Sequence, residues 1–454
     1  MKYKIYFSFI FIIFFIISQS IKLPMISKKI DADFSKISNN INNTTRFLLE
    51  GNMEMIANCP LMQTQICVGI PVQCIDVLFD TGTPYLVISD YVNMGIKFVT
   101  NFYNSSKSET LSDASEIQLR VQSKTSTIIG YEVKDKVSIT SKNNMPYLFS
   151  FLLSRNIFEY YIGILGLGHY YPKLDNENSF DERFSFVHYL KRNKIISKLI
   201  FGYEYTDRIH GNIYFGEEPK SMRNGYFKCK VQNFISFSNK WHCNLLSAYI
   251  NNGKNYTILS STVAFSTGQY NIYGPYNQVS KFIDIIKKIG GEKCRINSIE
   301  FNEKKWLRIY CDLDINISDF PDISFDIVGF KMTLLKRDLF RKEKINGSKI
   351  GYISTLHGSN EYNYWDFGEP ILKNYDMVFN YEDNTVGFKA NNNYYGGDWL
   401  GVIILFIVLI CSIFVAIYII KNRKTIFNKK FKEEDMKKLK IENNLKETLE
   451  MKEL

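Results

Sequence analysis

The feature that most constrains the fold is a short motif that the chain contains twice. Residues 77–83 read Val-Leu-Phe-Asp-Thr-Gly-Thr, and residues 263–269, about 186 positions later, read Val-Ala-Phe-Ser-Thr-Gly-Gln. In each copy an apolar run of strand-like composition leads into one polar residue and then Thr-Gly, where glycine permits a tight turn. Two related lobes that face each other would bring these turns together, so the echo predicts a chain built from two similar halves.

The sequence between Cys59 and about Ala390 favours an all-β architecture. Short runs rich in β-branched and aromatic residues are separated by Gly, Asn and Ser, and long amphipathic helical patterns are few. With 45% hydrophobic residues in a length of 454, the chain can form a large buried core. The strands predicted include 66–70, 74–79, 85–89, 133–139, 198–203, 212–215 and 376–380, and the predicted helices are 185–194 and 276–289.

Two apolar segments outside this region predict a topology. Residues 1–20 have a basic start, an apolar run and small residues at the end, which is the pattern of a secretory signal peptide; an uncleaved signal anchor is the alternative. Residues 399–420 carry no charge, and at about 1.5 Å per residue they are long enough to span a membrane core of about 30 Å.

The charges that follow the second segment orient it. Lys421, Arg423 and Lys424 come directly after the span, and the positive-inside rule places such residues in the cytoplasm. We therefore expect a type I single-pass protein of the secretory pathway or cell surface. Its ectodomain is luminal or extracellular, a single C-terminal helix anchors it, and residues 421–454 form a charged cytoplasmic tail.

Cysteines and glycosylation motifs agree with an oxidising compartment. The chain has eight cysteines, and because Cys411 lies in the predicted span, an odd number remains outside it. N-glycosylation motifs, which predict a glycoprotein, occur at Asn42, Asn43, Asn104, Asn255, Asn316 and Asn346. The net charge of +10 is spread along the chain rather than clustered, so we expect no nucleic-acid partner.

The chemistry of the repeated motif depends on carboxylates. Hydrolysis of a peptide bond without a metal or a nucleophilic side chain needs a water held between two carboxyl groups. One carboxyl takes a proton from the water while the other protonates the carbonyl oxygen, and their closeness makes the pair share one proton. A strand that ends in Asp80-Thr81-Gly82 suits such a centre.

Several ordered landmarks resemble the pepsin family of aspartic proteases. Residues 68–73, Val-Gly-Ile-Pro-Val-Gln, and the segment 77–83 resemble the family's first hairpin and active-site loop, and residues 161–168, Tyr-Ile-Gly-Ile-Leu-Gly-Leu-Gly, resemble its Asp-Gly-Ile-Leu-Gly-Leu-Gly. Similar landmarks stand at 211–216, Trp241, 365–368 and 384–388, and residues 21–29 are similar to the start of a prosegment. The resemblance covers nearly the whole region between the two apolar segments.

This resemblance implies a bilobal fold and the positions of its site. It implies a prosegment-like region at 21–57, an N-lobe at 58–216 and a C-lobe at 217–392, with a cleft that takes a peptide or protein and no cofactor. It also implies a disulfide between Cys294 and Cys311. The catalytic positions fall on Asp80 and Ser266, and the supporting positions fall on Thr81, Gly82, Thr83, Thr267 and Gly268.

The departures from the family pattern decide the predicted function. Ser266 stands where the second catalytic aspartate belongs, and Gln269 stands where a supporting threonine is usual. A serine holds no charge near neutral pH, so the pair that shares a proton cannot form. The flap tyrosine position falls near Arg120, and residues 121–124 replace the family's Gly-Thr-Gly. We therefore predict a membrane-anchored homologue with impaired catalysis, a pseudoprotease that binds peptide or protein.

The alternative function is an active aspartic endopeptidase with an atypical centre. Asp366 replaces an apolar residue in a strand that passes beside the second active-site loop in this family, so its carboxylate could approach Ser266 as a substitute partner. A surface protein without a binding role in its cleft is a further alternative.

Other candidate residues are interpreted as structural. The chain's five histidines have no spacing of the His-x-x-x-His kind, so we expect no metal site. Ser266 as a nucleophile would need a nearby base, and the sequence supplies none. Cys67 and Cys74 flank a predicted hairpin turn, and Cys229 and Cys243 are candidates for neighbouring strands, so each pair could form a disulfide.

Overall fold

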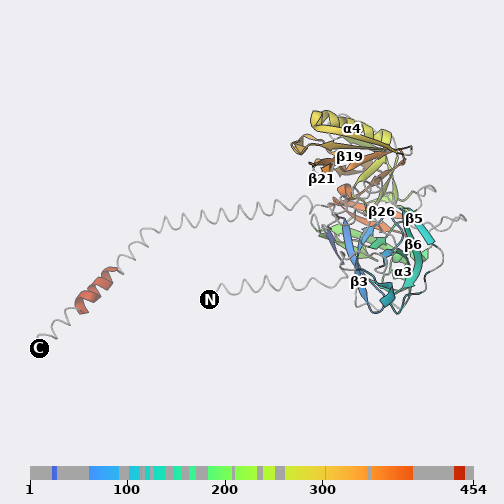
Figure 1. Cartoon of the computed structure of the whole chain (residues 1–454). Helices are drawn as coiled ribbons and strands as arrows, with labels where there is room; N and C mark the ends of the chain where they lie inside the picture. The colour runs from blue at the N-terminus through green and yellow to red at the C-terminus, as the bar shows by residue number, and fades with distance from the viewer. Residues whose placement is uncertain are drawn as a thin grey trace. The chain divides into compact units, whose positions relative to one another are not determined.

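The computed structural model confirms a mostly β architecture (Figure 1). It describes residues 23–27, 61–90, 102–112, 114, 118–122, 127–139, 147–154, 163–169, 182–206, 210–232, 239–250, 261–301, 303–345, 349–391 and 434–444. The chain divides into two units, Met1–Tyr394 and Tyr395–Leu454. All the strands among these residues belong to the first unit, which carries the candidate site.

A 14-stranded sheet forms the base of the first unit. Its main path runs β12-β26-β25-β10-β11-β1-β2-β3-β9-β4-β8-β6-β5, and β7 pairs with β2. The strands are β1 (Leu23–Ser27), β2 (Met62–Val68), β3 (Gln73–Asp80), β4 (Val87–Ser89), β5 (Gln118–Gln122), β6 (Thr127–Asp135), β7 (Val137–Ser138), β8 (Phe149–Ser154), β9 (Gly163–Gly166), β10 (Ile200–Tyr205), β11 (His210–Phe215), β12 (Phe227–Lys230), β25 (Tyr375–Asn380) and β26 (Thr385–Ala390).

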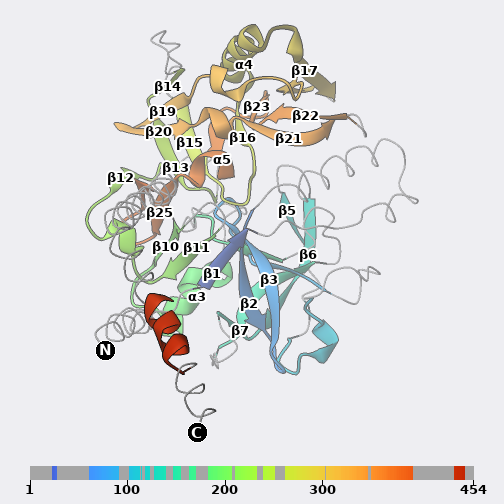
Figure 2. The same cartoon turned by 90° about the vertical axis from the view of Figure 1, so that its left-hand side faces the viewer.

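Two smaller sheets form most of the second half of this unit, which Figure 2 shows above the first sheet. A nine-stranded sheet has the main path β13-β15-β24-β16-β23-β18-β22-β21, with β17 paired to β18, and a three-stranded sheet has the order β14-β19-β20. Their strands are β13 (His242–Leu245), β14 (Ser247–Ile250), β15 (Ser261–Phe265), β16 (Ile272–Pro275), β17 (Cys294–Phe301), β18 (Lys304–Cys311), β19 (Ile323–Ile327), β20 (Phe330–Leu334), β21 (Phe340–Ile345), β22 (Lys349–Ser354), β23 (Leu356–Ser359) and β24 (Trp365–Phe367).

Both helices that the sequence predicts are formed. The helix predicted at 185–194 is α3 (Phe186–Arg192), and the helix predicted at 276–289 is α4 (Tyr276–Gly290). In α4 the apolar residues at helical spacing are all buried, because the helix packs on β17, β18 and β23. A short helix, α5 (Glu369–Leu372), follows β24 directly.

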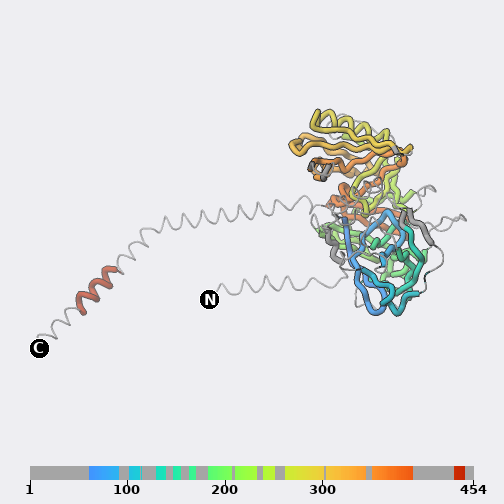
Figure 3. Tube along the Cα trace, viewed as in Figure 1, coloured from blue at the N-terminus to red at the C-terminus, as the bar shows by residue number. Residues whose placement is uncertain are grey.

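The chain's return to the first sheet ties the two halves together. After β24, strands β25 and β26 leave the second half, and β25 pairs antiparallel with β10, with Phe201 opposite Phe379. In Figure 3 this orange-red return of the trace lies between the blue-to-green half and the yellow-to-orange half. The two halves therefore share strands instead of being joined by a single linker.

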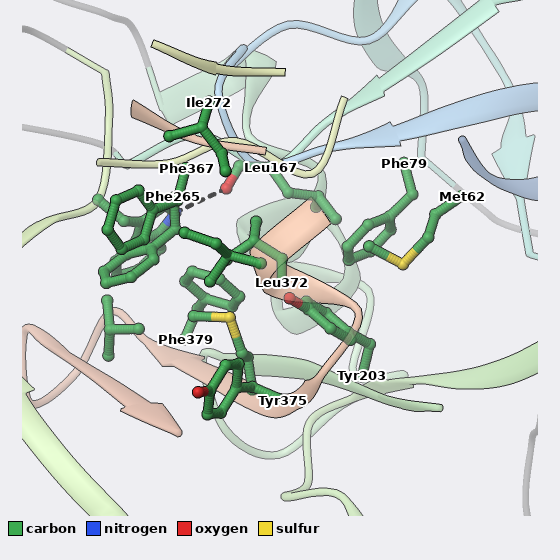
Figure 4. Close-up of a cluster of buried hydrophobic side chains, with 14 of the residues drawn as sticks. Met62, Phe79, Leu167, Tyr203, Phe265, Ile272, Phe367, Leu372, Tyr375 and Phe379 are labelled. Atoms are coloured by element: carbon green, nitrogen blue, oxygen red, sulfur yellow. Dashed lines mark hydrogen bonds between the residues drawn. The ribbon is translucent and has the colours of Figure 1, made fainter. Parts of the chain in front are cut away.

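One hydrophobic core runs through both halves. Phe79 and Phe265, the residues that precede Asp80 and Ser266, are both fully buried and belong to the same cluster of core side chains. Figure 4 shows them together with Phe379 of the returning strand. Trp241 also lies in this cluster, and its Nε1 donates a hydrogen bond of 2.8 Å to the carbonyl oxygen of Leu167. The apolar strands of the repeated motif are thus anchored on both sides of the site.

Strand β1 occupies an internal position in the large sheet. Its backbone pairs antiparallel with β11, Leu23 lying opposite Ile213, and with β2, Ile26 lying opposite Gln63. The strand falls within the range that the sequence predicts as prosegment-like. It fills the place between β2 and β11, so the sheet is continuous only through this segment.

Three disulfides are formed among the described residues. Cys67 pairs with Cys74 across the β2–β3 hairpin, and Cys229 on β12 pairs with Cys243 on β13. The pair Cys294–Cys311, which the resemblance implied, closes the β17–β18 hairpin. Both pairs left open by the sequence are therefore formed. Disulfides of this number indicate a secretory or extracellular compartment.

The predicted terminal segments lie outside the described residues. Residues 1–20 and 399–420 are not among them, and the helices of the described part include none long and apolar enough to cross a membrane. In the second unit, residues 434–444 form an exposed helix. This helix falls in the Lys- and Glu-rich tail.

Candidate active site

The repeated motif forms two matching strand ends. Strand β3 runs parallel to β9, with Phe79 opposite Leu165, and strand β15 runs parallel to β24, with Phe265 opposite Phe367. Strand β3 ends at Asp80, and β15 ends at Phe265, directly before Ser266. A glycine at or directly after the end of the neighbouring strand, Gly166 or Gly368, lies beside each turn. The two halves therefore build the same local structure around Asp80 and Ser266.

The two turns are joined by reciprocal hydrogen bonds between buried threonines. The backbone N–H of Thr81 donates to Thr267 Oγ1 and that of Thr267 donates to Thr81 Oγ1, both at 3.1 Å. Thr81 Oγ1 in turn donates to the carbonyl oxygen of Phe265 at 2.7 Å, and Thr267 Oγ1 donates to that of Phe79 at 2.8 Å. This symmetric arrangement brings together the two sites that the sequence predicted to face each other.

Asp80 is held by backbone donors from both halves. Its Oδ1 accepts hydrogen bonds from the N–H of Gly82 at 2.7 Å and from the N–H of Gly268 at 3.3 Å. A Cβ at position 268 would lie 2.5 Å from Asp80 Cγ, so glycine is needed there for the close approach. Asp80 is half-buried.

Ser266 has a different environment. Its side chain is completely buried, and its Oγ donates a hydrogen bond of 2.6 Å to Asp366 Oδ1. Lys240 Nζ donates to Asp366 Oδ2 at 2.7 Å and to Ser266 Oγ at 3.3 Å. The serine therefore belongs to a buried cluster of three polar side chains, whereas Asp80 does not.

Asp80 and Ser266 nevertheless lie close to each other. A Cβ built on Gly82 would be 3.1 Å from Asp80 Oδ1 and 2.7 Å from Ser266 Oγ. The two polar atoms thus border the same small space beside the Gly82 backbone. The structure therefore places the two predicted positions beside each other.

Comparison with protein families decides the assignment of the fold. A model of eukaryotic aspartyl proteases matches residues 62–391, well over half of the 454-residue chain. The chain belongs to the eukaryotic aspartyl protease family. A search of curated proteins found no match. The matched range begins with β2 and ends one residue after β26, so it covers both halves of the first unit except β1.

Lys240 is the member of the site that the sequence did not reveal. It directly precedes Trp241, a landmark of the aspartyl protease resemblance, but it lies 26 positions from Ser266 and 126 from Asp366. No spacing rule connects residues so far apart in the chain. A single lysine beside a buried tryptophan gives no signal of its own.

The remaining residues of the two turns make their contacts through the backbone. The N–H of Gly168 donates to the carbonyl oxygen of Thr83 at 2.9 Å, and the N–H of Leu167 donates to that of Asp80 at 2.8 Å. The carbonyl oxygen of Gln269 accepts from the N–H of Glu369. Within the described part of the chain, the buried Oε1 of Gln269 has no hydrogen-bond partner. Gln269 is thus attached to α5 through its backbone.

The hairpin at the flap position is formed by β5 and β6. Arg120 lies opposite Ile129, and Val121 lies opposite Ile128. The residue at the predicted tyrosine position is therefore a paired strand residue of β5. Residues 123–126, which include part of the altered flap sequence, lie outside the described residues.

The histidines have structural surroundings. Burial lowers the pKa of His169 to about 4, against a partly compensating hydrogen bond between its Nε2 and Asn384 Oδ1. Burial, and then the charges of Arg308 and Arg341, hold the pKa of His357 well below its usual value. Among the described residues, no group of three or more His, Cys, Asp or Glu side chains is arranged to bind a metal.

Proposed function

We propose that this aspartyl protease homologue has lost most or all hydrolytic activity and binds a peptide or protein across its former catalytic centre. The observation that carries the proposal is the position of Ser266. It directly follows β15, in the place that corresponds to Asp80 at the end of β3, and its hydroxyl donates to Asp366. The centre therefore presents a single carboxylate, Asp80, to a bound molecule.

The loss of one carboxyl removes a specific part of the reaction. Two carboxyl groups can hold a water and divide the roles of acid and base between them, because their closeness forces them to share a proton. Ser266 carries no charge and its proton is engaged with Asp366, so it supplies neither role. General acid or base assistance is worth about 10²–10⁴-fold in rate, and removing one member of a catalytic unit often costs more.

The alternative is an active endopeptidase with an atypical centre, and one distance favours it. Asp366 Oδ1 lies 2.6 Å from Ser266 Oγ, so a carboxylate stands one hydroxyl group away from the place of the missing aspartate. In this mechanism Ser266 would pass a proton between Asp366 and a water bound at Asp80. The ion pair with Lys240 opposes it, because Asp366 already has a cation at 2.7 Å.

We further propose that the protein is a type I membrane glycoprotein with residues 1–20 removed as a signal peptide. The charge-free segment 399–420 and the basic residues after it support this topology. Extraction with alkaline carbonate tests the anchor, since a protein spanning the membrane stays with the lipid pellet. Release of the wild-type chain into the supernatant, as expected for a variant truncated before residue 399, would contradict it.

A cleavage assay tests the loss of activity. The purified protein is incubated with a peptide library at acid and neutral pH, beside Asp80→Ala and the matched control Asp76→Ala, which removes a carboxylate of the same strand. We expect all three proteins to leave the library intact. Cleavage by wild type and Asp76→Ala that disappears in Asp80→Ala would establish the active endopeptidase instead.

Binding is measured on the same proteins. Peptides from the library that the wild type retains are titrated by fluorescence anisotropy, together with a statine-containing inhibitor of aspartic proteases. We expect Asp80→Ala to weaken peptide binding by about tenfold or more, the value of a charge-assisted hydrogen bond, and Asp76→Ala to leave it unchanged. Retention of no peptide by the wild type would refute the binding role.

A further inference from the structure

We infer that Lys240 and Asp366 form a lock that keeps the side chain at position 266 paired with Asp366 instead of Asp80, so that the second active-site loop stays outside the chemistry even if its aspartate is restored. The inference rests on the proposed loss of activity and identifies two positioning residues for it. We call the three side chains of Ser266, Asp366 and Lys240 the serine lock.

The serine lock satisfies the hydrogen bonding of a buried carboxylate. Asp366 has no exposed surface, and its two oxygens are occupied by different partners, Oδ1 by Ser266 and Oδ2 by Lys240. The Lys240 side chain is only 14% exposed. Burying either charge alone would be strongly unfavourable, so each depends on the other. Ser266 is bound to both and is fixed in its orientation.

The internal repeat shows what the lock replaces. In the first half, Leu78 lies opposite Ile164 of β9, and in the second half Ala264 lies opposite Asp366 of β24. The residue behind Asp80 is therefore the buried, apolar Ile164, and the corresponding residue behind Ser266 is a carboxylate. Compared with the first half, the second half has Ser266 in place of the carboxylate of Asp80, and it has the carboxylate of Asp366 in place of Ile164.

This exchange makes restoration by one substitution ineffective. In Ser266→Asp, the introduced carboxyl would stand against Asp366, where the serine hydroxyl now makes a contact of 2.6 Å. Close carboxyl groups share a proton, so the new group would pair with Asp366 instead of with Asp80. Changing Asp366 to the isoleucine of the first half, and Lys240 to an uncharged methionine, removes that competitor.

Thermal unfolding of the full-length protein tests the lock independently of activity. Lys240→Met and Asp366→Ile are each expected to lower the midpoint by roughly 5 °C or more, because each removes the ion-pair partner of a charge that has little or no exposed surface. The double variant is expected to recover most of this loss. Additive losses in the double variant would show that the two residues are not coupled and would overturn the inference.

Cleavage of the peptide library tests the functional part. We expect Ser266→Asp alone to stay within a fewfold of the wild-type rate, and Ser266→Asp with Lys240→Met and Asp366→Ile to exceed it by about 100-fold. The matched control combines Ser266→Asp with Lys373→Met, since Lys373 forms an ion pair with Asp338 of similar burial, 15% and 8% exposed. This control is expected to behave like Ser266→Asp.

Two results overturn the lock in this assay. One is a large gain from Ser266→Asp alone, and the other is a triple variant that folds but gains nothing over Ser266→Asp. If the wild type itself cleaves peptides in an Asp80-dependent manner, the proposed function fails. In that case the thermal unfolding midpoints of the two single variants and the double variant still test whether Lys240 and Asp366 are coupled, as the lock requires.

Discussion

Replacing His169 by glutamine should remove one defined part of the acid sensitivity of this fold. His169 is 4% exposed, with its ring 4.5 Å from that of Trp241 and its Nε2 2.6 Å from Asn384 Oδ1. Burial lowers its pKa to about 4 from an ordinary value of 6.5. The folded state therefore prefers the neutral ring, whereas the unfolded chain binds a proton already near pH 6.5.

The sign and size of the effect follow from this difference. A group with a lowered pKa in the folded state supports folding fully above pH 6.5, and this support is lost as the pH falls toward 4. At about 1.36 kcal/mol for each pKa unit, the interval corresponds to about 3 kcal/mol of unfolding free energy. Below pH 4 both states hold the proton and the loss becomes constant.

Urea unfolding at several pH values between 4 and 8 measures the effect. At pH 8 the His169 ring of the wild type is neutral in both the folded and the unfolded state. The difference in unfolding free energy between His169→Gln and wild type at this pH therefore reports only the change in packing. From pH 8 to pH 4, we expect the wild type to lose about 3 kcal/mol more than the variant. Parallel pH profiles for the two proteins would refute the assignment of this acid sensitivity to His169.

Other perturbations give results of different kinds. Burial raises the pKa of Asp376 to about 6 from 3.8, so its contribution to the unfolding free energy is present at acid pH and is lost as the pH rises through 6. Asp376→Asn should remove this loss of up to about 3 kcal/mol, measured by urea unfolding at several pH values. An unchanged dependence of the unfolding free energy on pH would contradict it. Thr81→Val removes the two hydrogen bonds of the Thr81 hydroxyl, which donates to the carbonyl oxygen of Phe265 and accepts from the N–H of Thr267, and should cost about 1–3 kcal/mol in the same assay; a cost near zero would show that Thr267 and its neighbours adapt. Replacing Cys294 and Cys311 by alanine opens a loop of sequence separation 17 and should cost about 3 kcal/mol, which calorimetry would detect as a lower Tm, whereas an unchanged Tm would contradict a stabilising role.

The architecture was largely predictable because its signals are local or repeated. The runs at 74–79 and 376–380 and the helical spacing of 276–289 each coincide with an element of the structure. The doubled motif was enough to place Asp80 and Ser266 at facing turns. Their contact through Thr81 and Thr267 follows from the pseudosymmetry of the chain.

The environment of Ser266 was only partly predictable. Asp366 stood out as a charge at a position expected to be apolar, which indicated that its carboxylate could approach the serine, and the structure places it in contact. Lys240 lay outside any motif because its role depends on where β13 and β24 bring the chain, over a separation of 126 residues. Long-range pairing of this kind is a property of the folded chain and leaves no local pattern.

Strand β1 is an internal strand of the large sheet that a single chain segment connects to the strands beside it. It contributes an internal strand, with β2 on one side and β11 on the other, yet only the connection between Ser27 and Met62 joins it to β2 along the chain. A cut in that connection would turn a covalent neighbour into a bound peptide, held by the backbone hydrogen bonds of both flanking strands. Its retention would then depend on concentration, so dilution after such a cut would separate the sheet into β2 and β11 edges that a strand from another polypeptide could pair with.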